Sequence, residues 1–276
     1  MSIYSPFRDI DTVEALIDYL QSKGKNHQSY YHYTTWESLE KIYANQSFLL
    51  TRGNSLNIND QHEALMKGSW QEWNKTYIGS FSYGAAENMA MWGLYGLPWE
   101  DAVRIEIPKE AMTAWVNSIN EVELWGSNDP LPVNADVHLS DIVYVHGQAG
   151  SNKMQLTHRD TTMWVTQGSG LMGVDRDPRM TGYIKNYAWH YENEVRLIVR
   201  LLHDEGNEKV KLLIPENVLS RIQVVTGPSF QHKSSHLYRC LQNEGRLRES
   251  GFRHLVKYRP LCALCSHKNF ERYTEE

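Results

Sequence analysis

Short strand-like segments outnumber helical segments along this chain, and the two kinds do not alternate in a regular order. A doubly wound parallel sheet requires regular alternation of strands and helices. Its absence predicts an α+β fold with a mixed or antiparallel sheet core and flanking helices. Alternating, β-branched or aromatic runs predict the main strands at residues 77–82, 102–107, 142–146, 189–201, 210–214 and 222–226.

The domain organisation follows from the lack of any internal boundary. The 276 residues, 41% of them apolar, can bury one large core, and no linker, charge block or repeat divides them. Turn-rich stretches at 126–134 and 168–182 predict loops inserted between strands of one sheet. We therefore predict a helical segment at 1–28, a single α+β domain at 29–260 and a tail at 261–276.

The N-terminal part predicts a helix followed by a strand. Apolar residues at helical spacing predict a helix over residues 11–23 that Gly24 ends. The next run is aromatic and places His32 at the end of a first strand. Thr34-x-x-Glu37 then has the pattern of a capping box, which predicts that a second helix begins there.

The composition and the pattern of apolar residues indicate a protein of a reducing compartment that lies outside the membrane. No run of eighteen apolar residues occurs, and the N-terminus lacks a basic segment followed by an apolar one. Three cysteines do not make a disulfide framework. The formal charge of −5 does not favour the phosphate backbone of nucleic acid. We therefore expect a cytoplasmic protein that has no membrane partner.

Two signals near the C-terminus permit other partners. A basic series there is either a nucleic-acid patch or, more commonly, a solvated face. Cys262, Cys265 and His267 are zinc-ligand types, but no second cysteine pair follows, so no metal is expected. The basic series comprises Arg246, Arg248, Arg253, Lys257 and Arg259.

Two carboxylates in the predicted strand 189–201 are the strongest candidates for chemistry. Alternation places Glu192, Glu194 and Arg196 on one face of that strand. Carboxylates two residues apart on a strand lie about 7 Å apart at the backbone, close enough to contact one bound substrate. One could stabilise a developing cation while the other accepts a proton. The alternative is a solvated face with a Glu–Arg ladder.

The remaining candidate residues are ordinary when each is taken alone. His32 has the commoner explanation of a hydrogen-bonded, semi-buried histidine. Ser80 and Ser82 face one side of the predicted strand 77–82. Trp92 and Tyr95 lie on a helix predicted over residues 85–95 and have the commoner explanation of a packed helix face.

In combination these segments resemble an uncharacterised bacterial and phage family. The resemblance covers roughly residues 29 to 230 and rests on an aromatic strand, an Asn-Asp-x-x-Glu turn, Ser-Phe-Ser followed by Met-Trp-x-x-Tyr, and a late Trp-x-x-Glu-x-Glu-x-Arg strand. In this chain these motifs are Tyr31-His32-Tyr33-Thr34, Asn59-Asp60-Gln61-His62-Glu63, Ser80-Phe81-Ser82, Met91-Trp92-Gly93-Leu94-Tyr95 and Trp189-His190-Tyr191-Glu192-Asn193-Glu194-Val195-Arg196.

That family is similar, more distantly, to the ADP-ribosyltransferases, which implies a split sheet and NAD as substrate. Their signature places Arg or His on a first strand, Ser-x-Ser or Tyr on a second and Glu or Glu-x-Glu on a third. His32, Ser80 with Ser82, and Glu192 with Glu194 fill these places in order. The chain mixes two patterns, because a leading His usually accompanies Tyr rather than Ser-x-Ser.

The resemblance implies a role for each residue. Glu194 stabilises the oxocarbenium character that develops when the nicotinamide bond breaks, and Glu192 orients or deprotonates the acceptor. His32 bonds the adenosine ribose, and Ser80 supports Glu194. The other NAD contacts are expected from Tyr31, Tyr33, Thr34, Ser82, Trp92 and Tyr95, of which Tyr33, Trp92 or Tyr95 stacks on nicotinamide.

Several functions fit this sequence. The leading prediction is transfer of ADP-ribose from NAD to a protein or nucleic acid, as a toxin, phage factor or defence effector that a partner could restrain. An NAD glycohydrolase would use water as the acceptor. A non-catalytic module would hold a nucleotide or peptide in the same cleft. A zinc-stabilised nucleic-acid adaptor built on the basic C-terminal region is a further alternative.

Overall fold

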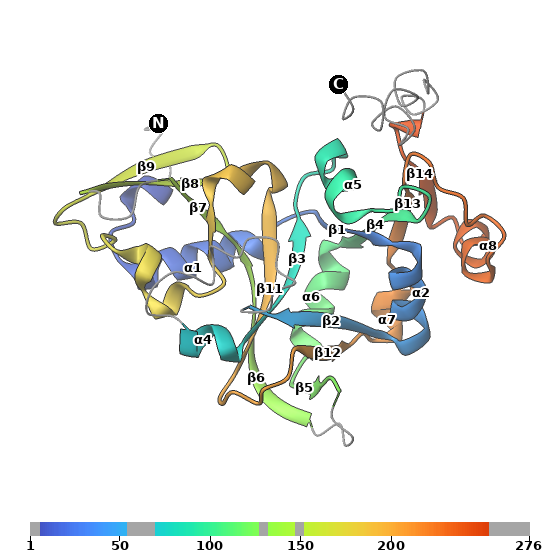
Figure 1. Ribbon diagram of the computed structural model, residues 1–276, viewed down its shortest axis with the longest axis horizontal. Helices are drawn as coiled ribbons and strands as arrows, with labels where there is room; N and C mark the ends of the chain where they lie inside the picture. Colours follow the sequence, from blue (N-terminus) through green and yellow to red (C-terminus); the bar gives the residue numbers. More distant parts are fainter. Residues whose placement is uncertain (1–5, 54–69, 127–131, 147–151, 254–276) are drawn as a thin grey trace, which may run out of the picture. The chain divides into compact units, whose positions relative to one another are not determined.

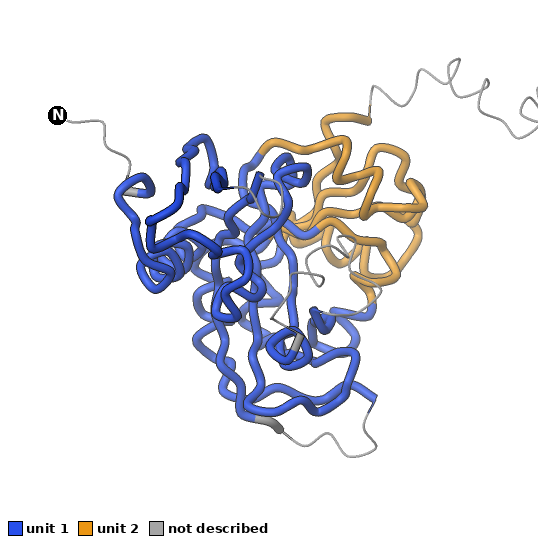
Figure 2. The backbone as a smooth tube through the Cα atoms, turned by 60° about the vertical axis from the view of Figure 1, so that its left-hand side comes forward, with its two compact units in different colours: residues 1–32, 41–85, 107–222 blue, residues 33–40, 86–106, 223–276 orange. Residues whose placement is uncertain are grey.

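A computed structural model describes residues 6–53, 70–126, 132–146 and 152–253 (Figure 1). Over these residues the chain is α+β with mostly antiparallel sheets, which confirms the predicted fold class at that level. The chain divides into two compact units, each assembled from separate segments (Figure 2). Unit 1 is residues 1–32, 41–85 and 107–222, and unit 2 is residues 33–40, 86–106 and 223–276. The sequence boundaries at residues 28 and 260 stay predictions.

A closed ring of antiparallel strands forms the centre of unit 1. The strand order is β11-β6-β5-β12-β2-β3, and β3 also pairs with β11, which closes the ring. Near its end, β3 additionally pairs with β1 (Ser29–Thr35), with Tyr31 opposite Ser82. The ring strands are β2 (Ser47–Arg52), β3 (Thr76–Ser82), β5 (Glu121–Leu124), β6 (Pro132–Asp141), β11 (Glu194–Leu201) and β12 (Lys209–Leu213).

A second sheet in unit 1 has the order β10-β7-β8-β9. Strand β10 runs parallel to β7, and the other pairs are antiparallel. Alternate residues of β8 and β9, such as Leu156 and Val165, are buried, as expected for strands with one face in a core. The strands are β7 (Val143–His146), β8 (Lys153–His158), β9 (Thr161–Thr166) and β10 (Ile184–Asn186).

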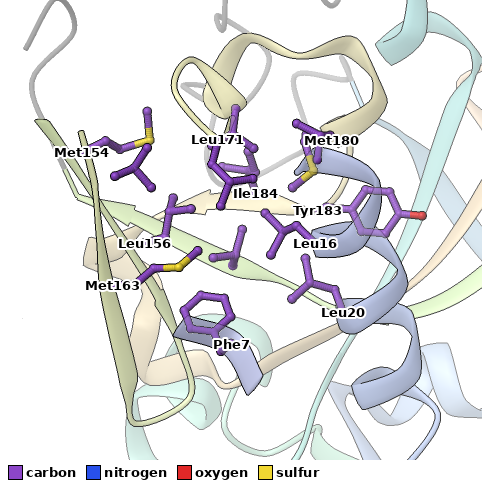
Figure 3. Packing of buried hydrophobic residues seen from close by; sticks show 14 of the residues in the cluster. Phe7, Leu16, Leu20, Met154, Leu156, Met163, Leu171, Met180, Tyr183 and Ile184 are labelled. Carbon is purple, nitrogen blue, oxygen red and sulfur yellow. The ribbon is translucent and has the colours of Figure 1, made fainter. Parts of the chain in front are cut away.

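An apolar core lies between this second sheet and helix α1 (Val13–Gly24) (Figure 3). The helix contributes Val13, Leu16 and Leu20, as its sequence spacing predicts. From the ring, Ile198 of β11 joins the same core, so this face of β11 is turned toward the second sheet. The Thr12 side chain accepts a hydrogen bond from the backbone N–H of Ala15 and caps the helix.

The other helices of unit 1 that the structure describes are short. They are η1 (Pro6–Asp9), α4 (Trp70–Lys75), α6 (Lys109–Ser118), η2 (Val174–Arg176), η3 (Pro178–Met180), η4 (Tyr187–Glu192) and α7 (Glu216–Leu219). Helix α2 (Trp36–Asn45) begins in the segment of unit 2 and ends in that of unit 1. Among the described residues, none of the helices is both long and apolar enough to cross a bilayer.

Unit 2 has its own small core. Strand β13 pairs antiparallel with β4 and parallel with β14. Its apolar cluster comprises Tyr33, Met91, Trp92, Ala102 and Val225. The described elements that lie wholly or mainly in this unit are α5 (Met89–Tyr95), β4 (Ala102–Pro108, whose last two residues belong to unit 1), β13 (Gln223–Thr226), α8 (His236–Asn243) and β14 (Leu247–Glu249).

Several predicted boundaries are wrong for local reasons. The second helix is capped by Thr35, not Thr34, since the Thr35 hydroxyl accepts from the Ser38 N–H at 3.3 Å. His32 lies inside β1 rather than at its end. The helix predicted from residue 85 begins at Met89 because Asn88 caps it. Residues 132–134, predicted as loop, belong to β6.

Candidate functional site

Two neighbouring strands of the ring bring together the predicted serine and glutamate residues. In the β3–β11 pair, Ser82 lies opposite Glu194, and Ser80 lies opposite Arg196. Directly opposed residues of antiparallel strands point to the same face, so these four side chains share one face. The Ser80 hydroxyl donates a 2.6 Å hydrogen bond to Glu194 Oε1. Ser80 itself is exposed, whereas Ser82 is buried.

Glu192 reaches the same place by a turn rather than by strand alternation. The predicted strand 189–201 begins only at Glu194, because residues 187–192 form the 3₁₀ helix η4. Between them, Asn193 adopts a left-handed conformation with φ of 47°. Its N–H donates to the His190 carbonyl, and its carbonyl accepts from the Tyr83 N–H. This turn replaces the predicted Glu-x-Glu face of a single strand.

Lys185 joins the two carboxylates and was not identified from the sequence. It lies in β10, and its Nζ is 2.6 Å from Glu192 Oε2 and 3.0 Å from Glu194 Oε2. The same Nζ lies 4.9 Å from the centre of the Trp189 ring, a cation–π contact. A lone lysine in a three-residue strand carries no motif, so only the tertiary structure reveals this contact.

Arg196 holds Glu194 from its own strand. The Arg196 Nε donates to Glu194 Oε1 at 2.7 Å, and Nη2 donates to Oε2 at 3.2 Å. Nη1 donates to the Gly182 carbonyl. Burial alone would raise the pKa of Glu194, but the positive charges of Arg196 and Lys185 and the hydrogen bonds from Arg196 and Ser80 lower it to about 2. Glu194 is therefore an ionised carboxylate at neutral pH.

The four charged side chains are almost completely buried. Glu192, Glu194, Lys185 and Arg196 are each at most 5% exposed. Two carboxylates and two cations balance, which is the condition for burying charges at acceptable cost. Next to them, the Tyr144 hydroxyl accepts from the Glu194 N–H at 3.0 Å, and burial raises the Tyr144 pKa well above its usual value.

His32 points to the opposite face of the sheet from Glu194. Its ring lies 4.9 Å from the Phe48 ring and 5.6 Å from the Phe81 ring, and Phe81 alternates with Ser80 and Ser82 along β3. The His32 Nδ1 lies 2.9 Å from the Ser80 carbonyl, which makes Nδ1 the donor. Burial lowers the pKa of His32. The three predicted strands are thus neighbours, but their side chains do not all converge.

The other predicted contacts are divided between the two units. Tyr31 is buried in unit 1, where its carbonyl lies 3.5 Å from the Ser82 hydroxyl. Tyr33, Thr34, Trp92 and Tyr95 belong to unit 2. There, the Tyr33 and Trp92 rings pack edge to face, with centroids 4.9 Å apart, and Trp92 is completely buried. These two rings are part of the core of unit 2.

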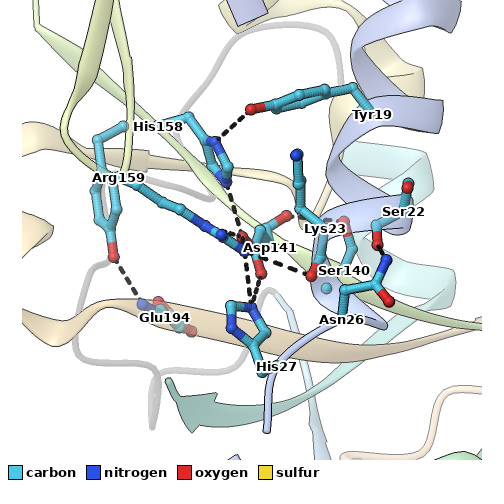
Figure 4. A network of polar contacts seen from close by, with 12 residues as sticks. Tyr19, Ser22, Lys23, Asn26, His27, Ser140, Asp141, His158, Arg159 and Glu194 are labelled. Carbon is cyan, nitrogen blue, oxygen red and sulfur yellow. Dashed lines mark hydrogen bonds and ion pairs between the residues drawn. The ribbon is translucent and has the colours of Figure 1, made fainter. Parts of the chain in front are cut away.

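A second buried polar cluster lies beside this site in unit 1, where Figure 4 draws it together with Glu194, and it was also missed from the sequence. Asp141, at the end of β6, is fully buried. It accepts from the Nε2 atoms of His27 (2.5 Å) and His158 (2.7 Å) and from Arg159 Nη2 (2.9 Å). Burial would raise the pKa of Asp141, but the hydrogen bonds from the two histidines lower it overall. Asp141 is therefore ionised.

The surroundings of this cluster fix its histidines. The Tyr19 hydroxyl lies 3.1 Å from His158 Nδ1, and burial lowers the pKa of His158. The His27 ring stacks on Tyr83 with centroids 4.5 Å apart. Arg159 adopts a left-handed conformation in the turn between β8 and β9. Its carbonyl accepts a hydrogen bond from His190 of η4, which links this cluster to the segment that carries Glu192.

Two sequence signals lie outside the described residues, namely Asn59-Asp60-x-x-Glu63 and Cys262, Cys265 and His267. Within the described ranges, no three His, Cys, Asp or Glu side chains are placed to hold a metal ion. No protein-family model matches the chain, and no curated protein is significantly similar to it. The functional class therefore rests on the geometry of the site and on the sequence motifs.

Proposed function

We propose that the chain is an NAD-dependent ADP-ribosyltransferase with an ADP-ribosyltransferase-like fold and a reaction centre at Glu194 in unit 1. The observation that carries the proposal is the hydrogen bond between Ser80 and Glu194. These residues are 114 positions apart, yet they meet on neighbouring strands. In the family signature one strand carries Ser-x-Ser or Tyr and another carries Glu or Glu-x-Glu, and the contact between Ser80 and Glu194 supports the resemblance of the motifs.

The proposed reaction uses NAD as its substrate and needs no metal. The bond between nicotinamide and ribose breaks, its electron pair leaves with nicotinamide, and positive charge develops at the ribose carbon. Glu194, ionised and held by Arg196, stabilises that charge. The acceptor nucleophile bonds to the same carbon, and Glu192 takes its proton. Ser80 fixes the orientation of the Glu194 carboxylate.

Access is the main requirement of this proposal. Ser80 is the exposed member of the group, and Glu194 is 2% exposed behind it. We therefore place the approach of NAD on the Ser80 side. Because Glu194 is almost completely buried, contact between the ribose and its carboxylate requires a local opening on that side.

A non-catalytic binding module is the second candidate, and a specific observation favours it. Both Glu194 oxygens accept hydrogen bonds from side chains of the chain itself, and His32 faces away from them. In that case the charge network is purely structural, and a nucleotide or peptide binds without reaction.

An NAD glycohydrolase differs from the transferase only in using water as acceptor.

The proposal also includes the acceptor, the compartment and the biological role of the enzyme. The acceptor is a protein or nucleic acid in the cytoplasm, and a toxin or phage-defence effector of this kind could be held inactive by a partner. An assay of NAD turnover with cell lysate tests whether such an acceptor is present in cells.

The deciding experiment measures loss of NAD by purified wild-type protein and by Glu194→Gln, with and without cell lysate. We expect Glu194→Gln to lower the rate at least about 100-fold, because the charge that stabilises the cation is removed. Glu123→Gln is the matched control. Glu123 is also ion-paired, to Lys211, and also lies in the ring, but on β5.

Each outcome assigns one function. Turnover that needs lysate and labels a macromolecule with ADP-ribose establishes the transferase. Equal turnover without lysate establishes the glycohydrolase. Binding of NAD by calorimetry without turnover establishes the binding module, and absence of both binding and turnover rejects NAD as the ligand.

A further inference from the structure

Lys185 occupies a distinctive place in the charge network. It comes from β10 of the second sheet, whereas Glu194 and Arg196 come from β11 of the ring and Glu192 from η4. Its side chain is almost completely buried, and its Nζ contacts both carboxylates. A single ammonium group therefore connects three elements that converge on this point.

The two carboxylates would repel each other without this ammonium group. Each carries an oxygen within 3.0 Å of the same nitrogen, and each is at most 3% exposed. Two carboxylates that share a dry site either separate or take up a proton, because like charges disfavour each other's ionised form. The groups that face Glu194 are Tyr144 from β7, Lys185 from β10, Glu192 from η4, and Ser80 and Arg196 from the ring. Two of these are cations.

The left-handed turn at Asn193 makes the arrangement depend on Lys185. Because Glu192 precedes that turn and Glu194 follows it, their side chains are not held parallel by one strand. Lys185 supplies the common contact that sets the position of one carboxylate relative to the other.

We propose that Lys185 is a positioning residue for NAD cleavage, which holds the Glu192 and Glu194 carboxylates together through its ammonium group. The inference rests on the proposed function. It assigns Lys185 no contact with NAD, so its replacement acts on kcat through the carboxylates and leaves the KM for NAD nearly unchanged. A lysine that only stabilised the fold would lower the melting temperature without changing the pH profile of the folded enzyme.

The test measures kcat and KM for NAD from about pH 4.5 to 8 in the full chain, below the melting temperature of each variant. We expect Lys185→Met to lower kcat at neutral pH by about 30-fold and to move the acid limb of the kcat profile to higher pH. Lys185→Arg should restore most of both, because the positive charge returns. Lys211→Met is the control, since Lys211 pairs with Glu123 at a distance from the site.

A double variant keeps the test decisive if Lys185→Met does not fold. Lys185→Met combined with Glu192→Gln removes a neutral pair, which a buried site tolerates better than loss of one partner. We expect its kcat to lie within about 3-fold of that of Glu192→Gln alone, because Lys185 then has one carboxylate fewer to hold.

The outcomes separate this inference from the proposed function. If the wild type cleaves NAD and Lys185→Met keeps the wild-type kcat and pH profile, the positioning role is wrong and the proposed function stands. A double variant whose kcat lies about 30-fold below that of Glu192→Gln alone also overturns the inference. If the wild type does not cleave NAD, the proposed function is wrong, and the inference fails with it.

Discussion

Ser80 and Glu194 meet across β3 and β11, where the hydroxyl of Ser80, an exposed residue, donates a 2.6 Å hydrogen bond to the carboxylate of Glu194, which is 2% exposed. This contact joins the surface of unit 1 to a buried network of two carboxylates and two cations. Two motifs that are distant in the sequence meet at this contact.

Replacement of Ser80 by Ala should have a small effect on stability and a measurable effect on turnover. A hydrogen bond to a charged group contributes about 1.5–3 kcal/mol to the free energy of unfolding. Ser80 is an exposed residue, so water can replace the lost bond, and we expect a loss smaller than this range. Glu194 keeps Arg196 and Lys185, so we expect kcat for NAD cleavage to fall about 3- to 10-fold, much less than in Glu194→Gln. Urea unfolding and NAD turnover measure the two effects. Ser80→Thr, which keeps the hydroxyl, is the control, and equal losses in both variants would contradict the role of the hydrogen bond.

Asn193 should tolerate Gly but not Val. Its φ of 47° lies in the left-handed region, which Gly and Asn adopt readily and a β-branched residue does not. We expect Asn193→Gly to remain within about 0.5 kcal/mol of the wild type and Asn193→Val to lose about 2 kcal/mol or more. The midpoint of urea unfolding measures both changes.

The same pair of variants tests whether the turn matters to the site. Asn193→Val forces the backbone between Glu192 and Glu194 toward an extended conformation, so the Lys185 bridge should be lost with it. Unfolding midpoints that are equal for Gly and Val would mean that the chain at Asn193 is not left-handed in solution.

The sequence predicted the parts of this structure that depend on local pattern. Helix α1 follows from the spacing of its apolar residues, and β3 follows from its alternation. The common face of Ser80 and Ser82 also follows, because alternation fixes the face of each residue once a strand is given.

The features that depend on tertiary contacts could not be predicted. Whether His32 shares a face with Glu194 depends on the register between β1 and β3, and nothing local fixes that register. A left-handed Asn193 leaves no periodic signal, so a strand was predicted through it. Lys185 and Asp141 are single charged residues whose partners are distant in the chain or lie on other elements.

Acidification from about pH 7.5 to 5.5 should destabilise the protein through His158. Burial lowers the pKa of His158 below its unfolded value near 6.5, so between these two pKa values the unfolded state binds more protons. Stability is therefore fully present above the unfolded pKa and declines as the pH falls through it, by up to about 1.4 kcal/mol per pH unit for one group. The lowered pKa of His32 acts in the same direction.

Variants of single histidines separate these contributions. We expect His158→Gln to be less stable than the wild type at pH 7.5 but to lose less stability between pH 7.5 and 5.5, as measured by urea unfolding at each pH. His203→Gln should keep the wild-type dependence, because His203 is exposed. An unchanged pH dependence in His158→Gln would show that His158 is not kept neutral by its surroundings.

Gly24 and Gly93 should respond to Ala in opposite directions. A Cβ added at Gly24, the last residue of α1, would lie 2.4 Å from the Ser140 Cα and 2.6 Å from the Asp141 nitrogen, so the helix end would have to move off β6. The backbone of β6 cannot move aside as the end of a flexible side chain can, so we expect Gly24→Ala to lower the free energy of unfolding by about 2–3 kcal/mol or more.

At Gly93, inside α5, the nearest atom is 3.9 Å away, and Ala should stabilise that helix by about 0.5–1 kcal/mol. Both changes are measured by urea unfolding. Gly24 packs directly on β6, the strand that ends at Asp141. A Gly24→Ala variant as stable as the wild type would therefore contradict the close packing of α1 against β6. The geometry of the Asp141 cluster depends on that packing.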